Sequence, residues 1–327
     1  MSFYAKVILD SIAPCGQRIT TIECKYPRFI HSEIMTHRDR ARNSASSRAI
    51  PWEKLVVCER DDPNWIKIEE GKFYKLADNC MKGMILNDPV VPIHWGAEQK
   101  GMQSGDEIPL ELRDEAEKIW LEARDAAVGY ASRLAFLGVH KSLCNRLTEP
   151  FMWITVVMTA TQWKNFFKLR CHPAAERHFQ KIAGMIQDAI NESVPKYLLE
   201  GEWHLPYIQE GENNITLVDY FGLEKYLEIM HKYAYGMSCK EANVEIWKRI
   251  SAARCARVSY LTHEGERKLT EDLKLFDRLM MRAEDSDDPP HSSPTEHVAQ
   301  ALSTHERSGC FVGWKQFRKE FKNECAD

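Results

Sequence analysis

The sequence predicts an α+β fold in which a twisted antiparallel sheet packs against helices, and three observations support this class. Two segments rich in β-branched and aromatic residues follow each other near the start of the chain. A long stretch beginning at Pro109 repeats apolar residues every three or four positions, which is typical of a helix. The 327 residues show neither a regular strand–helix alternation nor an all-helical pattern, so the parallel α/β and all-helical classes are excluded.

The first elements predicted are two strands joined as a hairpin. The segments "YAKVILDSI" (4–12) and "RITTIECKY" (18–26) surround the turn signal "APCG". A helix is expected over "PRFIHSEIM" (27–35), where apolar residues have helical spacing. Residues 61–106 contain repeated prolines and glycines, so we expect long loops around short elements there.

Two helices and a strand are predicted in the middle of the chain. The helix from Pro109 should end at Gly138, which suits a C-terminal cap. "FMWITVVMTAT" (151–161) has the length and composition of a buried strand, and a second helix is expected from Pro173. The apolar residues that repeat at three and four positions in the first helix are Leu112, Ala116, Ile119, Ala123, Ala126, Tyr130, Leu134 and Leu137, and those that share one face of the second are Phe179, Ile182, Ala183, Ile186 and Ile190.

Toward the C-terminus the polar segments 208–216 and 285–294 are predicted loops, the first separating the main body from a C-terminal third. The segment "GCFVGWKQFRK" (309–319) combines aromatic and basic residues that could contact nucleic acid. A half-buried strand or the start of a helix is the favoured interpretation.

The composition limits the possible partners and location. The chain is 44% hydrophobic with a net charge of −4, so it can bury a large core and has no overall attraction to nucleic acid or anionic membranes. It contains no apolar run long enough to cross a bilayer, and its start lacks the pattern of a signal peptide. We therefore expect a cytoplasmic protein, without membrane contact, whose ten cysteines are reduced thiols.

The segment "MTHRDRARNSASSRAIP" (35–51) carries Arg38, Arg40, Arg42 and Arg48 around small hydroxyl residues. Guanidinium groups, backbone N–H groups and serine hydroxyls together suit a phosphate-binding cradle. The alternative is a solvated basic loop. The flanking residues are apolar enough to fold, unlike a disordered Arg/Ser tail, and this favours the cradle.

The segment "WKNFFKLRCHPAAERHF" (163–179) places Arg170 among apolar residues. A buried charge is costly without a partner, so Arg170 is expected to be paired or to bind a ligand. The alternative partner within the chain is a carboxylate such as Glu176.

Two other segments contain residue types found in catalytic or metal sites. Cys171 and His172 could act as nucleophile and base, but adjacent side chains usually point in different directions, so we do not assign them that role. The spacing of His291 and His297 in "HSSPTEH" matches no common zinc pattern. We expect no metal site there, and instead a loop followed by a helix from about Pro294.

Together these segments resemble the motifs of the flavin-dependent thymidylate synthases, the ThyX family. The family signature R-H-R, seven residues, Ser is similar to Thr36-His37-Arg38 followed by Ser46, with Asn43 also in the family position. "NFFKLRCHPAAE" resembles the family segment N-x-x-F-x-x-L-R, and "NRLTEP" resembles its Arg-x-x-x-Pro segment before a strand. "AARCARVSY" and "HSSPTEH" resemble the family's first strand, A-R-V-S-Y, and its helix start H-x-S/T-P-F-E-H.

The order of the motifs differs from the familiar one. The last two motifs come first in the family, whereas here they occupy 252–260 and 291–297. The resemblance therefore implies one catalytic domain over 1–327 with a circularly permuted ThyX-like fold. In it, 1–207 carries the His-Arg-x7-Ser and Asn-x4-Arg motifs, and 250–327 supplies the part that is N-terminal in the family. It also implies a homotetramer with sites between subunits.

The resemblance implies an FAD-dependent thymidylate synthase that methylates C5 of dUMP to give dTMP, with methylenetetrahydrofolate and NADPH as co-substrates. It implies that Arg170 and Ser46 are catalytic, with Arg170 polarising the base, because a bidentate guanidinium stabilises charge on a carbonyl oxygen. The implied nucleotide-binding residues are Glu33, Ser44, Ser46, Arg48, Arg146 and Arg170, and the implied FAD-binding residues are His37, Arg38, Asn43, Asn165, Ser259, His291 and Ser293.

The sequence also departs from the family pattern, and this keeps other functions open. The departures are Glu33 for Gln, Thr36 for Arg, Ser44 for Glu, Ala49 for Tyr, Thr159 for Asn and Thr161 for Arg. One alternative is a flavin-dependent 5-hydroxymethylase of dUMP or dCMP, in which water intercepts the activated carbon. Another class is a nucleic-acid-binding protein using 36–48, which the acidic pI of 6.3 disfavours.

Overall fold

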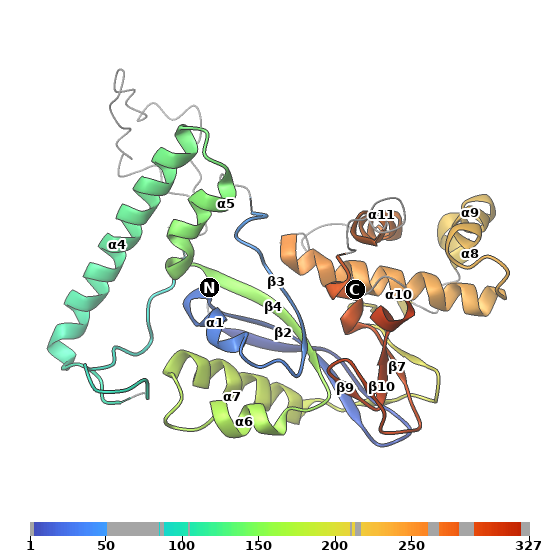
Figure 1. The fold of residues 1–327 in the computed structure, drawn as a ribbon, viewed down its shortest axis with the longest axis horizontal. Helices are drawn as coiled ribbons and strands as arrows, with labels where there is room; N and C mark the ends of the chain where they lie inside the picture. Colours follow the sequence, from blue (N-terminus) through green and yellow to red (C-terminus); the bar gives the residue numbers. More distant parts are fainter. Residues whose placement is uncertain are drawn as a thin grey trace.

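The computed structural model describes residues 3–50, 85, 88–103, 105–209, 211–212, 217–260, 268–280 and 291–321. Figure 1 shows a central sheet with two short helices beneath it, a long helix at one end and a helical layer at the other. This mixture of sheet and helix confirms the α+β class. Most of the loop region predicted over 61–106, and parts of those over 208–216 and 285–294, lie outside the described residues.

The main sheet has the strand order β3-β4-β2-β1-β5. Its strands are β1 (Tyr4–Ile12), β2 (Arg18–Pro27), β3 (Ala41–Ser44), β4 (Trp153–Ala160) and β5 (Lys196–Tyr197). The hairpin of β1 and β2 and the strand predicted after residue 150 are confirmed. Every pairing is antiparallel except that of β5, which runs parallel to β1.

The turn between β1 and β2 depends on Gly16. This residue has a φ of +82°, a conformation that side-chain-bearing residues rarely adopt. Its N–H donates to the carbonyl of Ala13 at 2.8 Å, which closes the turn and fixes the register of the hairpin.

Helices α6 (Lys164–Arg170) and α7 (Arg177–Glu192) cover one face of the main sheet (Figure 1). All five apolar residues predicted to share one face of the second helix are buried. The predicted start at Pro173 is wrong: α7 begins at Arg177. Its start is set by the carboxylate of Glu176, which accepts the N–H of Phe179 at 2.8 Å and so caps the helix.

Short helical elements link the strands of the main sheet. The helix predicted over 27–35 is present as a 3-10 turn, η1 (Arg28–Ile30), followed by α1 (His31–Ile34). Before β4 the chain forms α5 (Lys141–Cys144) and the 3-10 segment η2 (Asn145–Phe151).

The long helix α4 (Leu110–Phe136) is present, and Gly138 follows it with a φ of +81°, as predicted. The apolar residues that repeat at three and four positions along this helix are mostly exposed. Ile119 and Tyr130 are 56% and 58% exposed, while the core contact is made by a different side of the helix that includes Val128. The helix has two apolar sides, and the sequence pattern does not tell which one packs inward.

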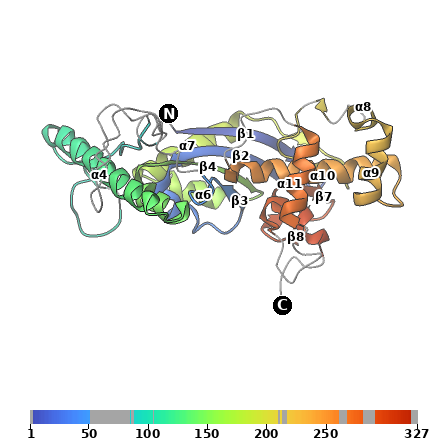
Figure 2. The same cartoon turned by 90° about the horizontal axis from the view of Figure 1, so that it is seen from above.

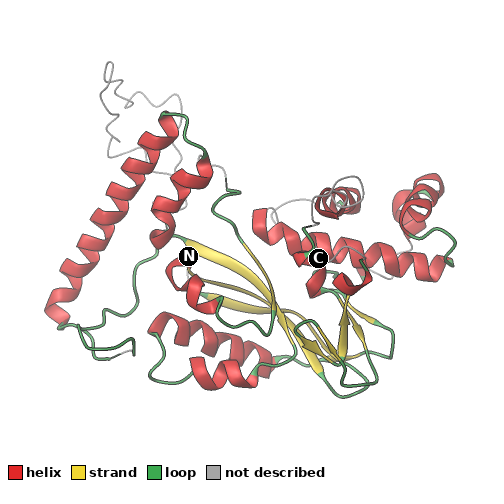
Figure 3. Cartoon of the chain, in the orientation of Figure 1, coloured by secondary structure: helices red, strands yellow, loops and turns green. Residues whose placement is uncertain are grey.

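The C-terminal third contributes a helical layer at the far end of the sheet (Figure 3). It consists of α8 (Leu217–Phe221), α9 (Leu223–Tyr233), α10 (Cys239–Arg257) and α11 (Leu269–Met280). Ser238 and Glu241 form a capping box at the start of α10, which helps to explain why the helix begins there.

The motif 252–260 was expected to be a strand by its resemblance to A-R-V-S-Y, and this is wrong. It forms the end of α10 and the 3-10 turn η4 (Val258–Tyr260). Alanine and arginine are strong helix formers, so the segment continues the helix begun at Cys239.

Small strands complete the fold beside the C-terminal helices. β10 (Trp314–Gln316), β7 (Ala299–Ala301) and β6 (Trp203–His204) form one sheet, and β8 (Arg307–Ser308) pairs with β9 (Phe311–Val312). The half-buried strand predicted within 309–319 is thereby confirmed, and the 3-10 turn η7 (Phe317–Glu320) follows it.

The helix expected from about Pro294 is a single 3-10 turn, η6 (Ser293–His297). Each cysteine in the described ranges is a free thiol, as predicted. Among the described residues no helix combines the length and apolarity needed to cross a membrane.

Candidate functional site

Arg170, at the C-terminal end of α6, is held by two contacts. Its Nε donates to Nε2 of His37 at 2.8 Å, and its guanidinium lies 4.5 Å from the ring centre of Phe179. The imidazole of His37 meets the rings of Phe166 and Phe179 edge-on. The predicted residues His37 and Arg170, far apart in sequence, are thus in direct contact.

His37 serves as a neutral acceptor in this pair. Burial, with Arg40 and Arg170 nearby, lowers its pKa to about 4. Since Nε2 accepts the hydrogen bond from Arg170, the single proton of the neutral ring is on Nδ1. His37 therefore fixes the orientation of the guanidinium without adding charge.

The alternative that Arg170 pairs with Glu176 is wrong. The carboxylate of Glu176 instead bonds Nδ1 of His178 at 2.5 Å and caps α7. Within the described part of the chain, nothing accepts a hydrogen bond from the two terminal nitrogens of Arg170. Its forked edge therefore remains open to a planar acceptor.

Glu33 lies in the same electrostatic environment. Burial and the nearby charge of Glu176 raise the pKa of its carboxyl group, and Arg170 opposes that shift. We call Glu33, His37 and Arg170 the Arg170 cluster. It brings three of the predicted site residues together.

The arginines of the segment 35–51 divide into two kinds. Arg40 is 3% exposed, pairs with Asp39 at 2.8 Å and lies 4.3 Å from the ring centre of Phe166. Arg42 donates to the carbonyl of His37 at 2.7 Å. These two arginines are part of the fold, so the solvated-loop alternative is wrong for them.

Arg38 and Arg48 are exposed. Only these two of the four arginines remain for an external anion, which also reduces the surface available for nucleic-acid binding.

A second group of predicted residues meets beyond β3. The N–H of Ser46 donates to the carbonyl of Ser259 at 3.2 Å. Nε2 of His297 lies 3.2 Å from Oδ1 of Asn43. Segments separated by more than 200 residues are therefore joined here. The motifs 252–260 and 291–297 lie against the N-terminal motif, which contains β3. We call this the β3 contact.

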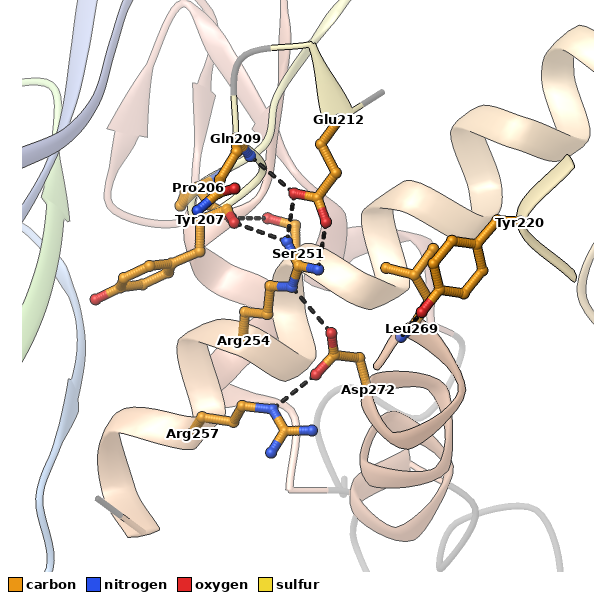
Figure 4. Close-up of polar contacts among 10 residues, drawn as sticks. All are labelled: Pro206, Tyr207, Gln209, Glu212, Tyr220, Ser251, Arg254, Arg257, Leu269 and Asp272. Atoms are coloured by element: carbon orange, nitrogen blue, oxygen red, sulfur yellow. Dashed lines mark hydrogen bonds and ion pairs between the residues drawn. The ribbon is translucent and has the colours of Figure 1, made fainter. Parts of the chain in front are cut away.

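A buried ion network holds the end of α10 that leads to Ser259 (Figure 4). Asp272 of α11 accepts from Nε of Arg254 at 2.9 Å and from Nε of Arg257 at 2.6 Å. Glu212 completes it with two hydrogen bonds to the terminal nitrogens of Arg254. Arg254 and Asp272 are almost fully buried, so their charges depend on each other.

Tyr207 joins this network to the main sheet. Its carbonyl accepts from Nη1 of Arg254 at 2.9 Å, and its hydroxyl donates to Glu23 of β2 at 2.6 Å. Its φ is +63°, an unfavourable value for tyrosine, which the two contacts on either side maintain.

The β3 contact continues into a chain of buried side chains that sequence reasoning missed. The hydrogen bonds run from Asn43 to His297 at 3.2 Å, to Thr159 at 2.8 Å, to Thr21 at 2.7 Å, to His204 at 2.8 Å and to Ser11 at 2.9 Å. We call these six residues the polar relay. The sequence signal for this chain was the presence of polar residues within otherwise apolar strands.

All the hydrogen bonds of the polar relay are donated in the same direction along the chain of six residues. Burial lowers the pKa of His204 and of His297 to about 3, so each ring is neutral and carries one proton. Because Oδ1 of Asn43 can only accept, Nε2 of His297 donates to it and Nδ1 accepts from Thr159. The same reasoning continues to Ser11, so every hydrogen bond points toward Asn43.

Arg48 and Arg146 are both exposed and lie on segments that are tied together. Nδ2 of Asn145 donates to the carbonyls of Ser47 at 2.6 Å and Ile50 at 3.0 Å. The hydroxyl of Ser47 donates to Glu149 at 2.5 Å. The two predicted phosphate-binding arginines, Arg48 and Arg146, thus lie on two segments that hydrogen bonds hold together, next to Ser46.

Other predicted residues lie apart from these groups. Asn165 is exposed on α6, His291 is exposed, and Ser293 is half-buried with its hydroxyl 3.5 Å from His291. The four-residue strand β3, which includes the half-buried Ser44, is about 13 Å long and lies between His37 and Ser46 in the sequence. The Arg170 cluster therefore adjoins the segment before β3, whereas Ser46 of the β3 contact follows the strand.

Neither a cysteine–histidine pair nor a metal cluster is formed in the described part. Burial raises the pKa of the Cys171 thiol, and Nδ1 of His172 accepts the N–H of Ala174 at 3.1 Å instead of facing the sulfur. No group of three His, Cys, Asp or Glu side chains in that part could hold a metal ion.

Comparison with known proteins gives limited similarity. No protein family and no curated protein matches the chain. Among solved structures, the UMP/dUMP methylase PolB from Streptomyces cacaoi bound with 5-Br UMP is similar at a TM-score of 0.43 and 11% identity, over 58% of this chain and 89% of that one. Its complex with 5-Br dUMP gives 0.40 and 12%, over 58% and 91%. Scores this low do not assign this chain to a family or a function.

Proposed function

We propose that this protein is an FAD-dependent thymidylate synthase-like enzyme that methylates C5 of dUMP, using methylenetetrahydrofolate and NADPH. The observation that supports it most is the state of Arg170. Its guanidinium is oriented by His37 and Phe179 while its terminal nitrogens lack an acceptor in the described chain. Such a fork can donate hydrogen bonds to a pyrimidine carbonyl and stabilise charge developing on its oxygen.

The remaining nucleotide contacts are assigned to the segments after β3. The hydroxyl of Ser46 and the exposed guanidinium groups of Arg48 and Arg146 suit a 5′-phosphate, because charge-assisted donors bind phosphate strongly. Ser44 and Glu33, where the sequence departs from the family pattern, are assigned to the neighbourhood of the base.

The donor set fits FAD. The residues proposed to hold it offer cationic or neutral polar groups, which suit a pyrophosphate and the polar edge of a flavin ring. They are His37, Arg38, Asn43, Asn165, Ser259, His291 and Ser293. When bound, reduced FAD supplies the hydride. Since Oδ1 of Asn43 is already bonded to His297, its amide nitrogen is the group left for a ligand.

The proposal places the complete site between subunits of a homotetramer. Arg170 contacts His37, which precedes β3 in the chain, whereas Ser46 follows β3. A site that uses both residues is completed if one subunit supplies the Arg170 cluster and another supplies the β3 contact.

The test is the absorption spectrum of the purified protein, followed during titration with dUMP and with dCMP. We expect flavin absorption that changes on binding dUMP, and conversion of dUMP to dTMP when NADPH and methylenetetrahydrofolate are added. A colourless protein that takes up no FAD and leaves dUMP unchanged would contradict the proposal.

A second candidate is a flavin-dependent 5-hydroxymethylase of dUMP or dCMP. It is favoured by Glu33, whose carboxyl group has a raised pKa close to Arg170 and could orient a water molecule beside the base. Mass spectrometry of the product separates the two functions, because a hydroxymethyl product is heavier than a methyl product by one oxygen atom.

A further inference from the structure

The helix α4 carries an apolar stripe that the rest of the described chain leaves exposed. Leu112, Ile119, Tyr130 and Leu137 are 52%, 56%, 58% and 75% exposed. On its other side, α4 is anchored by Val128, by Ala131 and by Trp120, whose Nε1 donates to the carbonyl of Val90 at 2.7 Å. We call the following set the outer stripe, in which Ala116 is half-buried and the other members are exposed: Leu112, Ala116, Ile119, Ala123, Ala126, Tyr130 and Leu137.

The outer stripe has the spacing of a coiled-coil seam. From Leu112 to Tyr130 its members alternate at four and three residues, which is the a/d pattern of a heptad repeat. The next position is Arg133, whose guanidinium lies 5.1 Å from the ring centre of Tyr130, and Leu137 resumes the pattern. Exposed apolar residues in such a regular repeat indicate a surface that another helix covers.

We propose that the outer stripe binds the outer stripe of a second copy of this chain, with the two α4 helices antiparallel. A two-fold axis between Arg124 and Asp125 places Leu112 opposite Leu137 of the partner subunit and Ile119 opposite Tyr130 of the partner subunit. Ala123 then lies opposite Ala126 of the partner subunit, and these small side chains allow the helices to approach closely at the centre.

The charges of α4 favour this orientation. The half from Leu110 to Ala123 contains five carboxylates and two basic residues, whereas the half from Arg124 to Leu137 contains one carboxylate and two basic residues. Antiparallel pairing sets the acidic half of one helix against the basic half of the other. Parallel pairing would bring the two acidic halves together and is disfavoured.

In the described part of the chain, the position of α4 leaves room for a partner. Figures 1 and 2 show it at the edge of the molecule, extending past the end of the main sheet. With 27 residues it is about 40 Å long, enough for nearly four heptads of contact.

The first test measures the mass of the full-length protein in solution by light scattering or sedimentation. Wild type is expected as a dimer or larger assembly of the 37.9 kDa chain, and Ile119→Glu is expected to halve that mass. In a dimer of this variant, the new carboxylate of each copy would face the apolar stripe of the other copy. We therefore expect the dissociation constant to rise at least about a hundredfold, or ~2.7 kcal/mol. The matched control is Leu110→Glu, on another side of the same helix and 73% exposed, which should leave the mass unchanged.

The second test determines the orientation by cross-linking. Leu112→Cys protein mixed with Leu137→Cys protein should form a disulfide between the two variants under mild oxidation, identified by mass spectrometry of the linked peptides. Leu112→Cys alone should not link to itself, because antiparallel pairing holds the two sulfurs about 37 Å apart.

Three outcomes would overturn the proposal. They are a monomeric wild type, an assembly that Ile119→Glu leaves intact, and a disulfide between two copies of Leu112→Cys. A monomer that Ile119→Glu destabilises would show that another segment of the same chain covers the stripe. Because Ile119 is more than half exposed, thermal unfolding of the variant should match that of the Leu110→Glu control, which separates lost association from misfolding.

Discussion

Arg170 illustrates how a single charged side chain can be ordered while its hydrogen-bonding edge stays open. The apolar segment around it predicted a partner, and the structure supplies one in the neutral ring of His37. The sequence suggested Glu176 because it is close in the chain, but the true partner lies 133 residues away. Local sequence thus indicates that a buried charge needs a partner, whereas only the tertiary fold determines which one it has.

Replacing Arg170 with lysine tests its proposed role. Lysine keeps the positive charge but loses the planar fork, so under the proposed function we expect turnover of dUMP to fall by roughly 10²–10³-fold. The unfolding midpoint should change little, because the side chain is only half-buried. The matched control is Lys168→Ala, an exposed cation on the same helix, which should keep full turnover. Equal turnover in the two variants would argue against the role.

At the scale of elements, patterns set by neighbouring residues were predictable. The buried face of α7 and the hairpin of β1 and β2 follow from periodicity and turn chemistry, and both are confirmed. The inward face of α4 was not predictable, because the helix has two apolar sides. The segment 252–260 was taken for a strand by resemblance, although its composition and the capping box at Ser238 favour a helix.

The candidate site was predictable only in part for the same reason. The motifs containing His37, Ser46 and Ser259 stand out in the sequence. The polar relay does not stand out, because Thr21, Thr159 and His204 lie on separate strands and are connected only by hydrogen bonds between the strands.

The packing of α10 against α11 depends on Asp272, and this gives an element-scale prediction. Asp272→Asn should lower the free energy of unfolding by ~3–5 kcal/mol, because it removes one of the two carboxylates that compensate the buried charge of Arg254. Urea unfolding followed by circular dichroism measures the loss. Lys274→Ala on the same helix removes an exposed ion pair with Glu271 and should have no measurable effect. Matching midpoints for the two variants would contradict this account of the network.

For the whole molecule, the two histidines of the polar relay, His204 and His297, predict sensitivity to acid. Their pKa values of about 3 in the fold lie below the ordinary value near 6.5, so below pH 6.5 the unfolded chain binds protons that the folded chain does not. Stability should therefore fall as the pH is lowered from about 6.5 toward 3. Each histidine contributes up to ~1.4 kcal/mol per pH unit.

Thermal unfolding between pH 7 and 4 measures this slope. His204→Gln removes one protonation step, so the slope of stability against pH should decrease by about one bound proton, although the variant starts from a lower stability. An unchanged slope would show that other groups dominate the acid response.

The single donor direction of the polar relay has a consequence for how a ligand could be sensed. If the amide of Asn43 turned to present its nitrogen, His297 would have to exchange tautomers, and each following hydrogen bond would have to reverse as far as Ser11. An intermediate arrangement would set two protons or two lone pairs against each other. The six residues thus form a two-state device in which the orientation of one amide on β3 fixes that of a hydroxyl on β1, on the other side of β2 and β4.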